Sequence, residues 1–423
     1  MALTIQRKNL LSFSALLLLS LMMIFIAQLY IIKILCMMTI GVLASKKVRV
    51  SNFVLLNFLL ILSYGFLGTS IGVLYQNPNP FQFLGVFFFW PIFWLFFISC
   101  FSASSCWWEQ YLKVLFISHI VIVLFDLFYA VAAFNGIILP NPFYGVDTGF
   151  SIYENSTRMT FINLNTLTFS TPILFILFFS QHGFGINKVY QIINVILTTI
   201  LLIISGRRSV MLMCVVVFFI PFFFSSCFSK EARKTARRIV LILFVLFFFI
   251  LCYVEYSFPG FLQGYCRTFY NAFDASAEPI KFAQSKMFVA EILEKPFWGH
   301  GFGAVFFEPS PGRMVYSSYF ELSYHQKLAT TGIFGFSLIV FVFLSTLWCS
   351  FYLSKKYKDV TLIAFGVGLM FMLIADATNP VLCSFDLMWP LYLCLAKINF
   401  YQIKKLFKNY TIILLSMILQ KAS

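Results

Sequence analysis

The sequence contains few charged residues for its length. Charged residues make up 11% of the 423-residue chain, whereas 61% of its residues are hydrophobic, and the mean hydropathy is +0.91. The core of a soluble globular protein is not this apolar. The composition therefore excludes a soluble globular protein and predicts an integral membrane protein.

Cysteine-based and metal-binding motifs are also missing. The 10 cysteines are scattered, and none forms a C-x-x-C pair or a metal-ligand spacing with one of the 4 histidines, so no metal site and no cofactor are expected. The formal net charge of +15 would suit nucleic acid, but the cations fall in short clusters between apolar runs. That arrangement is typical of membrane topology, and it excludes nucleic acid as a partner.

Apolar runs long enough to span a membrane fill most of the chain. They are expected at residues 6–44 (two helices joined near Gln28), 52–75, 83–101, 114–134, 164–179, 190–205, 210–228, 239–254, 332–353, 360–377 and 381–395. The predicted fold class is an all-α polytopic integral membrane protein with about twelve transmembrane helices. A last apolar piece at 412–419 is too short to span.

Basic clusters alternate with these spans and predict the topology. The clusters lie around Arg7, Lys46, Lys113, Lys188, Lys230, Lys355 and Lys404. All of them fall on one face, which the positive-inside rule makes the cytoplasm, so both termini are expected there. Residues 1–256 would form nine spans with an outer loop at 135–160, residues 257–327 a large periplasmic loop, and residues 328–423 three spans and a cytoplasmic C-terminal tail.

The large loop, residues 257–327, is the one long stretch that does not resemble a span. A helix is predicted over Ile280–Glu294, lying on the membrane surface with an apolar stripe at Ala283, Met287, Ala290 and Leu293. Trp298–Gly303 is a glycine-rich turn without a preceding strand, so it is no dinucleotide fingerprint. It predicts a close approach of the backbone to another helix or to a substrate.

Arg207 and Arg208 break the charge rule, because the alternation places them at the outer end of a helix. One interpretation is that they reach anionic lipid head groups. The other is that they bind a phosphorylated substrate, since a guanidinium group matches phosphate oxygens with two parallel hydrogen bonds.

Glu321 and His325 are candidate proton acceptors. Ser318–Glu321 has the pattern of a capping box, in which Glu321 would only close the start of a helix. On that helix Glu321 and His325 would be four residues apart and share a face. Such a pair could deprotonate a sugar hydroxyl.

Asp376 and Asp386 lie near the ends of the last long spans, on the predicted outer side. Carboxylates inside a membrane usually face a cavity or a partner. For Asp376 an ion pair with Arg208 or Arg267 is the alternative to a role in a site.

Three motifs between residues 205 and 376 resemble the bacterial O-antigen polymerase and O-antigen ligase group of polytopic membrane glycosyltransferases. They are Ser205–Ser209, similar to a Ser/Thr-x-x-Arg pattern that ends on Arg208; residues 281–303, similar to a helix followed by Pro-x-x-Gly-x-Gly; and residues 321–335, similar to the helix that closes the loop. The chain departs from the group in having Lys281 where members often have Arg. It also has Glu321 where many have His, with His325 one turn later.

The resemblance implies a GT-C-like enzyme of the bacterial inner membrane. It would transfer a glycan from an undecaprenyl diphosphate carrier to an acceptor hydroxyl at the periplasmic face, without nucleotide sugar or metal. The absence of a D-x-D pair from the outer loops agrees with this. We expect an O-antigen polymerase, with an O-antigen ligase as the alternative and a polysaccharide flippase as the third choice.

The resemblance and the residues together assign roles in the expected site. Expected to bind the diphosphate are Arg208, Arg207, Arg267 and Lys281; to act as base, His325 or Glu321; and to support them, Asp376, Tyr324, Arg313 and Arg158. The expected partners are an undecaprenyl-diphosphate-linked oligosaccharide, membrane lipids and a chain-length regulator protein.

Overall fold

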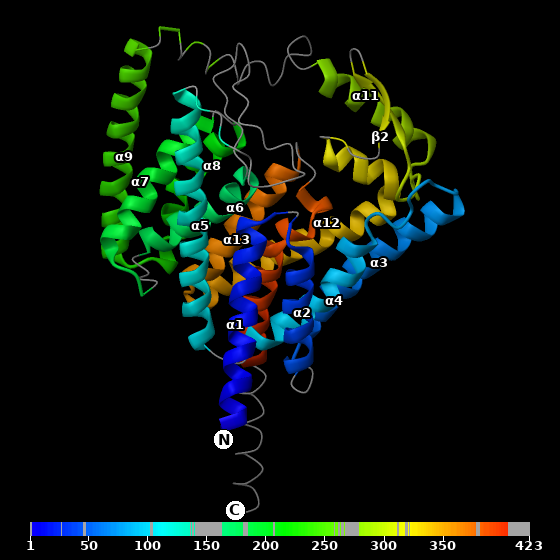
Figure 1. The fold of residues 1–423 in the computed structure, drawn as a ribbon, viewed down its shortest axis with the longest axis horizontal. Coiled ribbons are helices and arrows are strands. Elements are labelled where there is room, and N and C mark those ends of the chain that lie inside the picture. Colours follow the sequence, from blue (N-terminus) through cyan, green and yellow to red (C-terminus); the bar gives the residue numbers. More distant parts are fainter. Residues whose placement is uncertain are drawn as a thin grey trace, which may run out of the picture.

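Figure 1 shows the computed structural model of the chain. The structure describes residues 2–26, 28–44, 48–101, 105–135, 137, 139, 163–180, 185–205, 208–257, 259–260, 263, 266, 279–310, 313–317, 320, 322–377 and 381–404. These residues are mostly helical and include one two-stranded sheet. The predicted helical class is confirmed, and the sheet was not predicted.

The helices follow the apolar runs closely. The first seven are α1 (Ala2–Ile24), α2 (Tyr30–Ala44), α3 (Asn52–Leu74), α4 (Trp90–Phe101), α5 (Ser105–Phe134), α6 (Leu164–Phe179) and α7 (Lys188–Ser205). They are followed by α8 (Arg208–Phe223), α9 (Lys230–Ser257), α11 (Pro279–Glu294), α12 (Ser323–Tyr357), α13 (Val360–Asp376) and a helical stretch at 389–404. The break expected near Gln28 is confirmed, since it falls between α1 and α2.

One predicted span begins too early. Residues 381–388 form two 3₁₀ turns, η5 (Val381–Cys383) and η6 (Phe385–Leu387), and the helix starts only at residue 389. Asp376 accepts a hydrogen bond from the Leu382 amide at 2.8 Å, and Asp386 pairs with Lys33 at 2.9 Å. These contacts keep the segment out of a helix, although its composition is apolar.

Several helices have the character of membrane spans. Within the described residues, three are long and apolar enough to cross a membrane: Asn52–Leu74, Trp107–Ala132 and Ser323–Tyr357. Shorter apolar helices lie at Asn9–Ile24, Tyr30–Ala44, Gly85–Ser99, Leu164–Phe179, Lys188–Leu202 and Val360–Asp376. Large apolar side chains such as Phe66, Leu74 and Trp348 are exposed on their surfaces. Exposure of this kind suits contact with lipid and points to a membrane protein.

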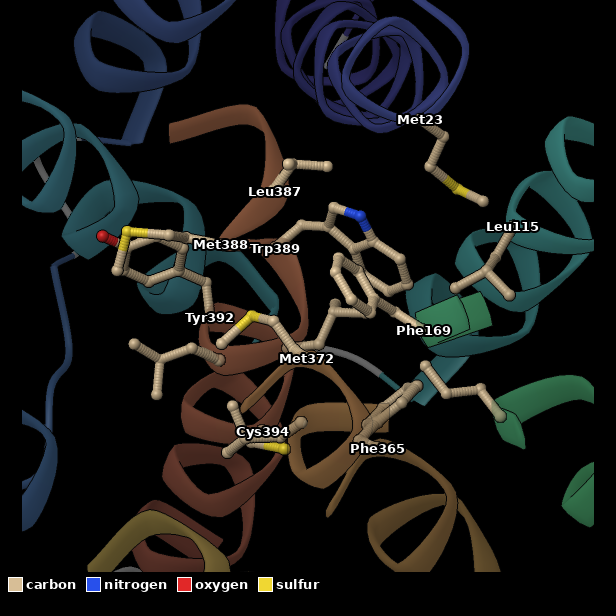
Figure 2. Close-up of a cluster of buried hydrophobic side chains, with 14 of the residues drawn as sticks. Met23, Leu115, Phe169, Phe365, Met372, Leu387, Met388, Trp389, Tyr392 and Cys394 are labelled. Atoms are coloured by element: carbon tan, nitrogen blue, oxygen red, sulfur yellow. The ribbon is translucent and has the colours of Figure 1, made fainter. Parts of the chain in front are cut away.

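The core lies where α1, α5, α6, α13 and the stretch 389–404 meet. Figure 2 shows its buried side chains, among them Met23, Leu115, Phe169, Phe365, Met372, Leu387, Met388, Trp389, Tyr392 and Cys394. Tyr392 stacks on Trp94 of α4 with ring centroids 4.5 Å apart. Packing of this kind fixes the helices that carry the polar residues described below.

The described part of the large loop lies at one end of the molecule. Strand β1 (Phe306–Ser310) pairs with β2 (Arg313–Ser317) in antiparallel register. Together with α11, this hairpin lies at the end opposite the beginning of α1 (Figure 1).

Candidate functional site

A break in α12 organises the candidate site. Gly332 has φ 60° and ψ −174°, so α12 is divided into a short helix beginning at Ser323 and a long apolar helix that ends at Tyr357. A Cβ atom at Gly332 would lie 2.2 Å from the Phe297 carbonyl oxygen. Only glycine tolerates both this dihedral angle and this approach. We take the spanning part of α12 to begin after Gly332.

Residues 296–303, which include the glycine-rich turn, are joined to this break by backbone hydrogen bonds. Four amide-to-carbonyl hydrogen bonds join the two: His300 to Ala329 (2.9 Å), Gly301 to Thr330 (2.7 Å), Ile333 to Pro296 (2.8 Å) and Phe334 to Phe297 (3.2 Å). They supply partners for backbone groups that the interrupted helix leaves without them. Two motifs that are separate in the sequence therefore form one backbone unit.

The same turn also approaches α3. The Phe302 amide donates to the Gly68 carbonyl at 2.8 Å, and the Asn77 side chain donates to the Phe302 carbonyl at 2.9 Å. A Cβ atom at Gly301 would lie 2.2 Å from the Gly72 nitrogen. Of the two partners expected for the glycine-rich turn, another helix is confirmed: the turn lies between α3 and α12.

A buried ion pair holds the short helix against α13. The Lys327 ammonium lies 2.9 Å from an Asp376 carboxylate oxygen, and both side chains are buried. Asp376 also accepts hydrogen bonds from the Ser323 hydroxyl at 3.1 Å and the Leu382 amide at 2.8 Å, and Lys327 donates to Ser323. Among the described residues the partner of Asp376 is therefore a lysine, whereas Arg267 and the side chain of Arg208 lie outside the described residues.

His325 and Tyr324 lie on the short helix. The Tyr324 hydroxyl donates to the Leu373 carbonyl of α13 at 2.5 Å, which orients this turn. His325 is partly buried, and burial lowers the pKa of its imidazole from the ordinary value. The neutral imidazole that a general base needs is therefore the prevailing form near neutral pH. No hydrogen bond joins His325 to another of the described residues, so its ring nitrogens have no such partner.

The predicted capping box at Ser318–Glu321 is wrong. The residue that caps α12 is Leu322, which makes no side-chain cap hydrogen bond. The preceding Phe320 is buried in an aromatic cluster, which draws the chain away from helical geometry. Glu321 lies outside the described residues, and the helix that carries His325 begins at Ser323. The predicted pairing of Glu321 with His325 stays a prediction.

The helix predicted over Ile280–Glu294 is confirmed as α11, and it also has a face buried in the protein that was not predicted. Ala290 and Leu293 are exposed, whereas Phe288 is fully buried. Phe288 packs edge-on against Phe306 of β1 and against Phe320, with ring centroids 5.5 Å and 4.9 Å apart. The hairpin, which was not predicted, supplies the partner that decides which face is buried.

Exposed apolar side chains continue from α11 into the glycine-rich turn. They are Phe282, Val289, Leu293, Phe297 and Trp298. Such a row on a helix at the end of a set of apolar spans is typical of a helix that lies in the membrane interface.

A second buried ion pair lies in the same part of the fold. Lys33 of α2 and Asp386 are 2.9 Å apart and both fully buried, and Lys33 also donates to the Phe25 carbonyl at 2.6 Å. Lys33 and Lys327 were not predicted to have a role. The signal for Lys33 is that it is the single lysine of the apolar helix α2, where its ammonium has to find a buried acceptor.

A small cavity adjoins Lys327. Its volume is about 10 Å³, and its walls include Tyr64, Phe302 and Gln326. This is room for about one water molecule. As the described residues have it, the Lys327–Asp376 pair positions the short helix against α13, and this cavity has no room for a sugar.

His300 makes a further polar cluster with the end of α11. Its Nε2 lies 3.2 Å from a Glu291 carboxylate oxygen and 3.1 Å from the Glu291 carbonyl oxygen. With Glu294 these residues offer three donor atoms within 4.8 Å of one another, a set that could hold a metal ion.

The structure does not describe the side chains of the arginines predicted to bind the diphosphate or to support the site. Arg208 is the first residue of α8 and Arg313 the first of β2, and the side chains of both are among those not described. Entirely outside are Arg158, Arg207, Arg267 and, of the candidate bases, Glu321. Lys281 lies in the first turns of α11 and is partly exposed. The predicted cation cluster stays a prediction.

No protein-family model matches the chain, and no curated protein matches it. The resemblance to O-antigen polymerases and ligases therefore rests on the three motifs, and the assignment to that group stays a proposal.

Proposed function

We propose that the protein is an O-antigen polymerase, a metal-independent glycosyltransferase of the bacterial inner membrane. The observation that best supports this is the backbone unit formed by residues 296–303 and the break at Gly332, because the two motifs that resemble the enzyme group meet there. Beside this unit, the short helix of α12 presents His325, a partly buried imidazole with a lowered pKa.

The proposed reaction moves a glycan from one lipid carrier to another. The acceptor hydroxyl oxygen attacks C1 of the donor sugar, the bond from C1 to the diphosphate oxygen breaks, and the undecaprenyl diphosphate leaves with the bonding electrons. His325 or Glu321 takes the hydroxyl proton. Arg208, Arg207, Arg267 and Lys281 stabilise the charge that develops on the diphosphate.

The surroundings suit a donor that is half lipid. The exposed apolar row from Phe282 to Trp298 can lie among lipid head groups, with the sugars above it and the isoprenoid tail between the helices. In the proposed topology about twelve spans place both termini in the cytoplasm. The described loop residues lie at the end opposite the beginning of α1, as this topology requires (Figure 1).

Deletion of the gene followed by electrophoresis of lipopolysaccharide tests the proposal. A polymerase predicts that the deletion strain carries a single repeat unit on its lipid A core, and that the plasmid-borne chain restores the ladder of lengths. If no repeat reaches the core while lipid-linked polymer accumulates, the protein is the ligase. An unchanged ladder would contradict both assignments.

A further inference from the structure

A second cavity lies at the far end of the bundle from the candidate site. It has a volume of about 410 Å³ and is formed where α5 begins, α6 ends, α12 ends and α13 begins, together with the stretch 389–404. From Gly332 to Tyr357 the long part of α12 measures about 37 Å. Ser12 of α1 donates to Gln110 of α5 at 3.1 Å, so this is the end at which α1 begins.

The Asp359 carboxylate at the wall of this cavity accepts several hydrogen bonds and pairs with a lysine. It accepts hydrogen bonds from the amide of Thr361 at 2.8 Å, from the Thr361 hydroxyl at 2.6 Å and from the Tyr401 hydroxyl at 2.6 Å. It also lies 3.3 Å from the Lys397 ammonium. Burial alone would raise the pKa of Asp359, but Lys397 and these hydrogen bonds lower it overall, so the carboxylate stays ionised.

Lys397 is anchored by Asp359 at the inner wall of the cavity. Its side chain is buried, and its ammonium lies 4.7 Å from the centre of the Trp108 ring. An ammonium has three N–H donors, and Asp359 is its single carboxylate partner among the described residues. Asp359 therefore holds the Lys397 ammonium in the cavity wall, and the ammonium can donate a hydrogen bond to an additional acceptor.

A second ammonium, that of Lys358, also lines the cavity. Lys358 ends α12 in a left-handed conformation with φ 53°, and its side chain is exposed. The remaining acidic residue of the lining, Glu109, is exposed as Lys358 is, so water and salt screen both charges alike and the two offset each other. The neighbouring Lys355 and Lys356 add positive charge outside the lining. The cavity therefore favours an anion.

Aromatic rings complete the walls. Tyr357 and Tyr401 stack with ring centroids 4.4 Å apart, and Trp108 lies beneath Lys397. Tryptophan and tyrosine beside lysine at the end of apolar helices are typical of the depth at which lipid head groups lie.

We propose that this cavity binds the phosphate of an anionic phospholipid head group from the cytoplasmic leaflet. Lys397 and Lys358 contact the phosphate oxygens, and the acyl chains pass along the helix ends. The volume of about 410 Å³ suits a glycerophosphate head group. This site lies on the face opposite the proposed catalytic site, so it stands whether or not the protein is a polymerase.

Native mass spectrometry of the purified, delipidated full-length protein tests the proposal. Titration with phosphatidylglycerol is expected to show a saturable bound lipid, with binding about fivefold weaker in Lys358→Gln. Lys355→Gln is the matched control, because it removes the same charge from the same end of α12 outside the cavity, and it should weaken binding less than Lys358→Gln does. Lys397→Gln is expected to bind at least as weakly as Lys358→Gln.

Two further titrations identify the source of the phosphate. Phosphatidylcholine should bind more weakly than phosphatidylglycerol, and glycerol 3-phosphate should not compete at equal concentration. Equal binding by Lys358→Gln and Lys355→Gln would overturn the site. Equal binding of phosphatidylcholine would overturn the preference for an anionic head group, and preference for glycerol 3-phosphate would overturn the lipid as its source. Because Lys358 is exposed, its variant tests the site even if Lys397→Gln fails to fold.

Discussion

Lys327 and Asp376 form a buried ion pair 2.9 Å long that joins two helices in the part of the fold where the glycine-rich turn is bound. The pair connects the short helix of α12 to the end of α13, and Ser323 contacts both of its members. A buried pair stabilises little relative to apolar residues, but removal of one partner leaves an uncompensated buried charge.

Lys327→Met or Asp376→Leu alone is expected to destabilise the protein by about 3–5 kcal/mol. Thermal unfolding of the detergent-solubilised protein should show a lower midpoint for each single variant. The double variant should recover most of the loss, because no charge is then left unpaired. Lys356→Met, an exposed change on the same helix, is the control. Wild-type stability of both single variants would contradict the pair.

Gly332→Ala is expected to cost at least about 1–3 kcal/mol, because alanine is strained at φ 60° and its Cβ would meet the Phe297 carbonyl oxygen. The midpoint temperature of unfolding should fall, and the amount of long-chain lipopolysaccharide on a gel should decrease. Gly85→Ala is the matched control, since a Cβ there meets no atom within 4 Å. Equal behaviour of the two variants would mean that the break is not needed.

Polymerisation by membrane fractions should depend on the neutral form of His325. Burial lowers the pKa of the His325 imidazole, so the neutral form persists at a pH below the ordinary histidine pKa of about 6.5. Activity should therefore fall only as the pH drops through a midpoint below that value. His325→Ala should lose activity, and Glu321→Ala should differ from it. His300→Gln should retain the acid limb of the profile. Wild-type rates in both alanine variants would place the base elsewhere.

Arg208→Ala is expected to abolish long-chain polysaccharide while the amount of protein stays unchanged, because the leaving diphosphate loses its guanidinium partner. Gel analysis of lipopolysaccharide measures this. The matched control is Arg237→Ala, an exposed arginine near the start of α9, which should leave the ladder intact. A normal ladder in Arg208→Ala would contradict the diphosphate assignment.

Cysteine labelling checks the topology. In a chain whose exposed Cys252 and Cys266 are replaced by serine, a cysteine at Gly312 should react with a membrane-impermeant reagent in intact cells, because the positive-inside rule places this loop in the periplasm. A cysteine at Lys356 should react only after permeabilisation. The reverse pattern would invert the proposed orientation.

Much of the helical framework could be predicted from the sequence, because hydrophobicity is a local property. The predicted runs at 52–75 and 164–179 agree within a residue with Asn52–Leu74 and Leu164–Phe179. The prediction failed at residues 381–388, whose apolar composition hides two 3₁₀ turns. It also did not reveal the buried face of α11, because that face depends on Phe306 and Phe320 from other parts of the chain.

The sequence alone determined the membrane character of the chain, the presence of most of its helices and the need for glycine in the turn at Trp298–Gly303, since composition and backbone freedom are readable residue by residue. Only the tertiary structure decided that this turn binds at Gly332, that Asp376 pairs with Lys327, and which cations meet at the cavity beside Asp359. These relationships join residues far apart in the chain. The energy of a buried charge depends on which partner the fold brings within hydrogen-bonding distance.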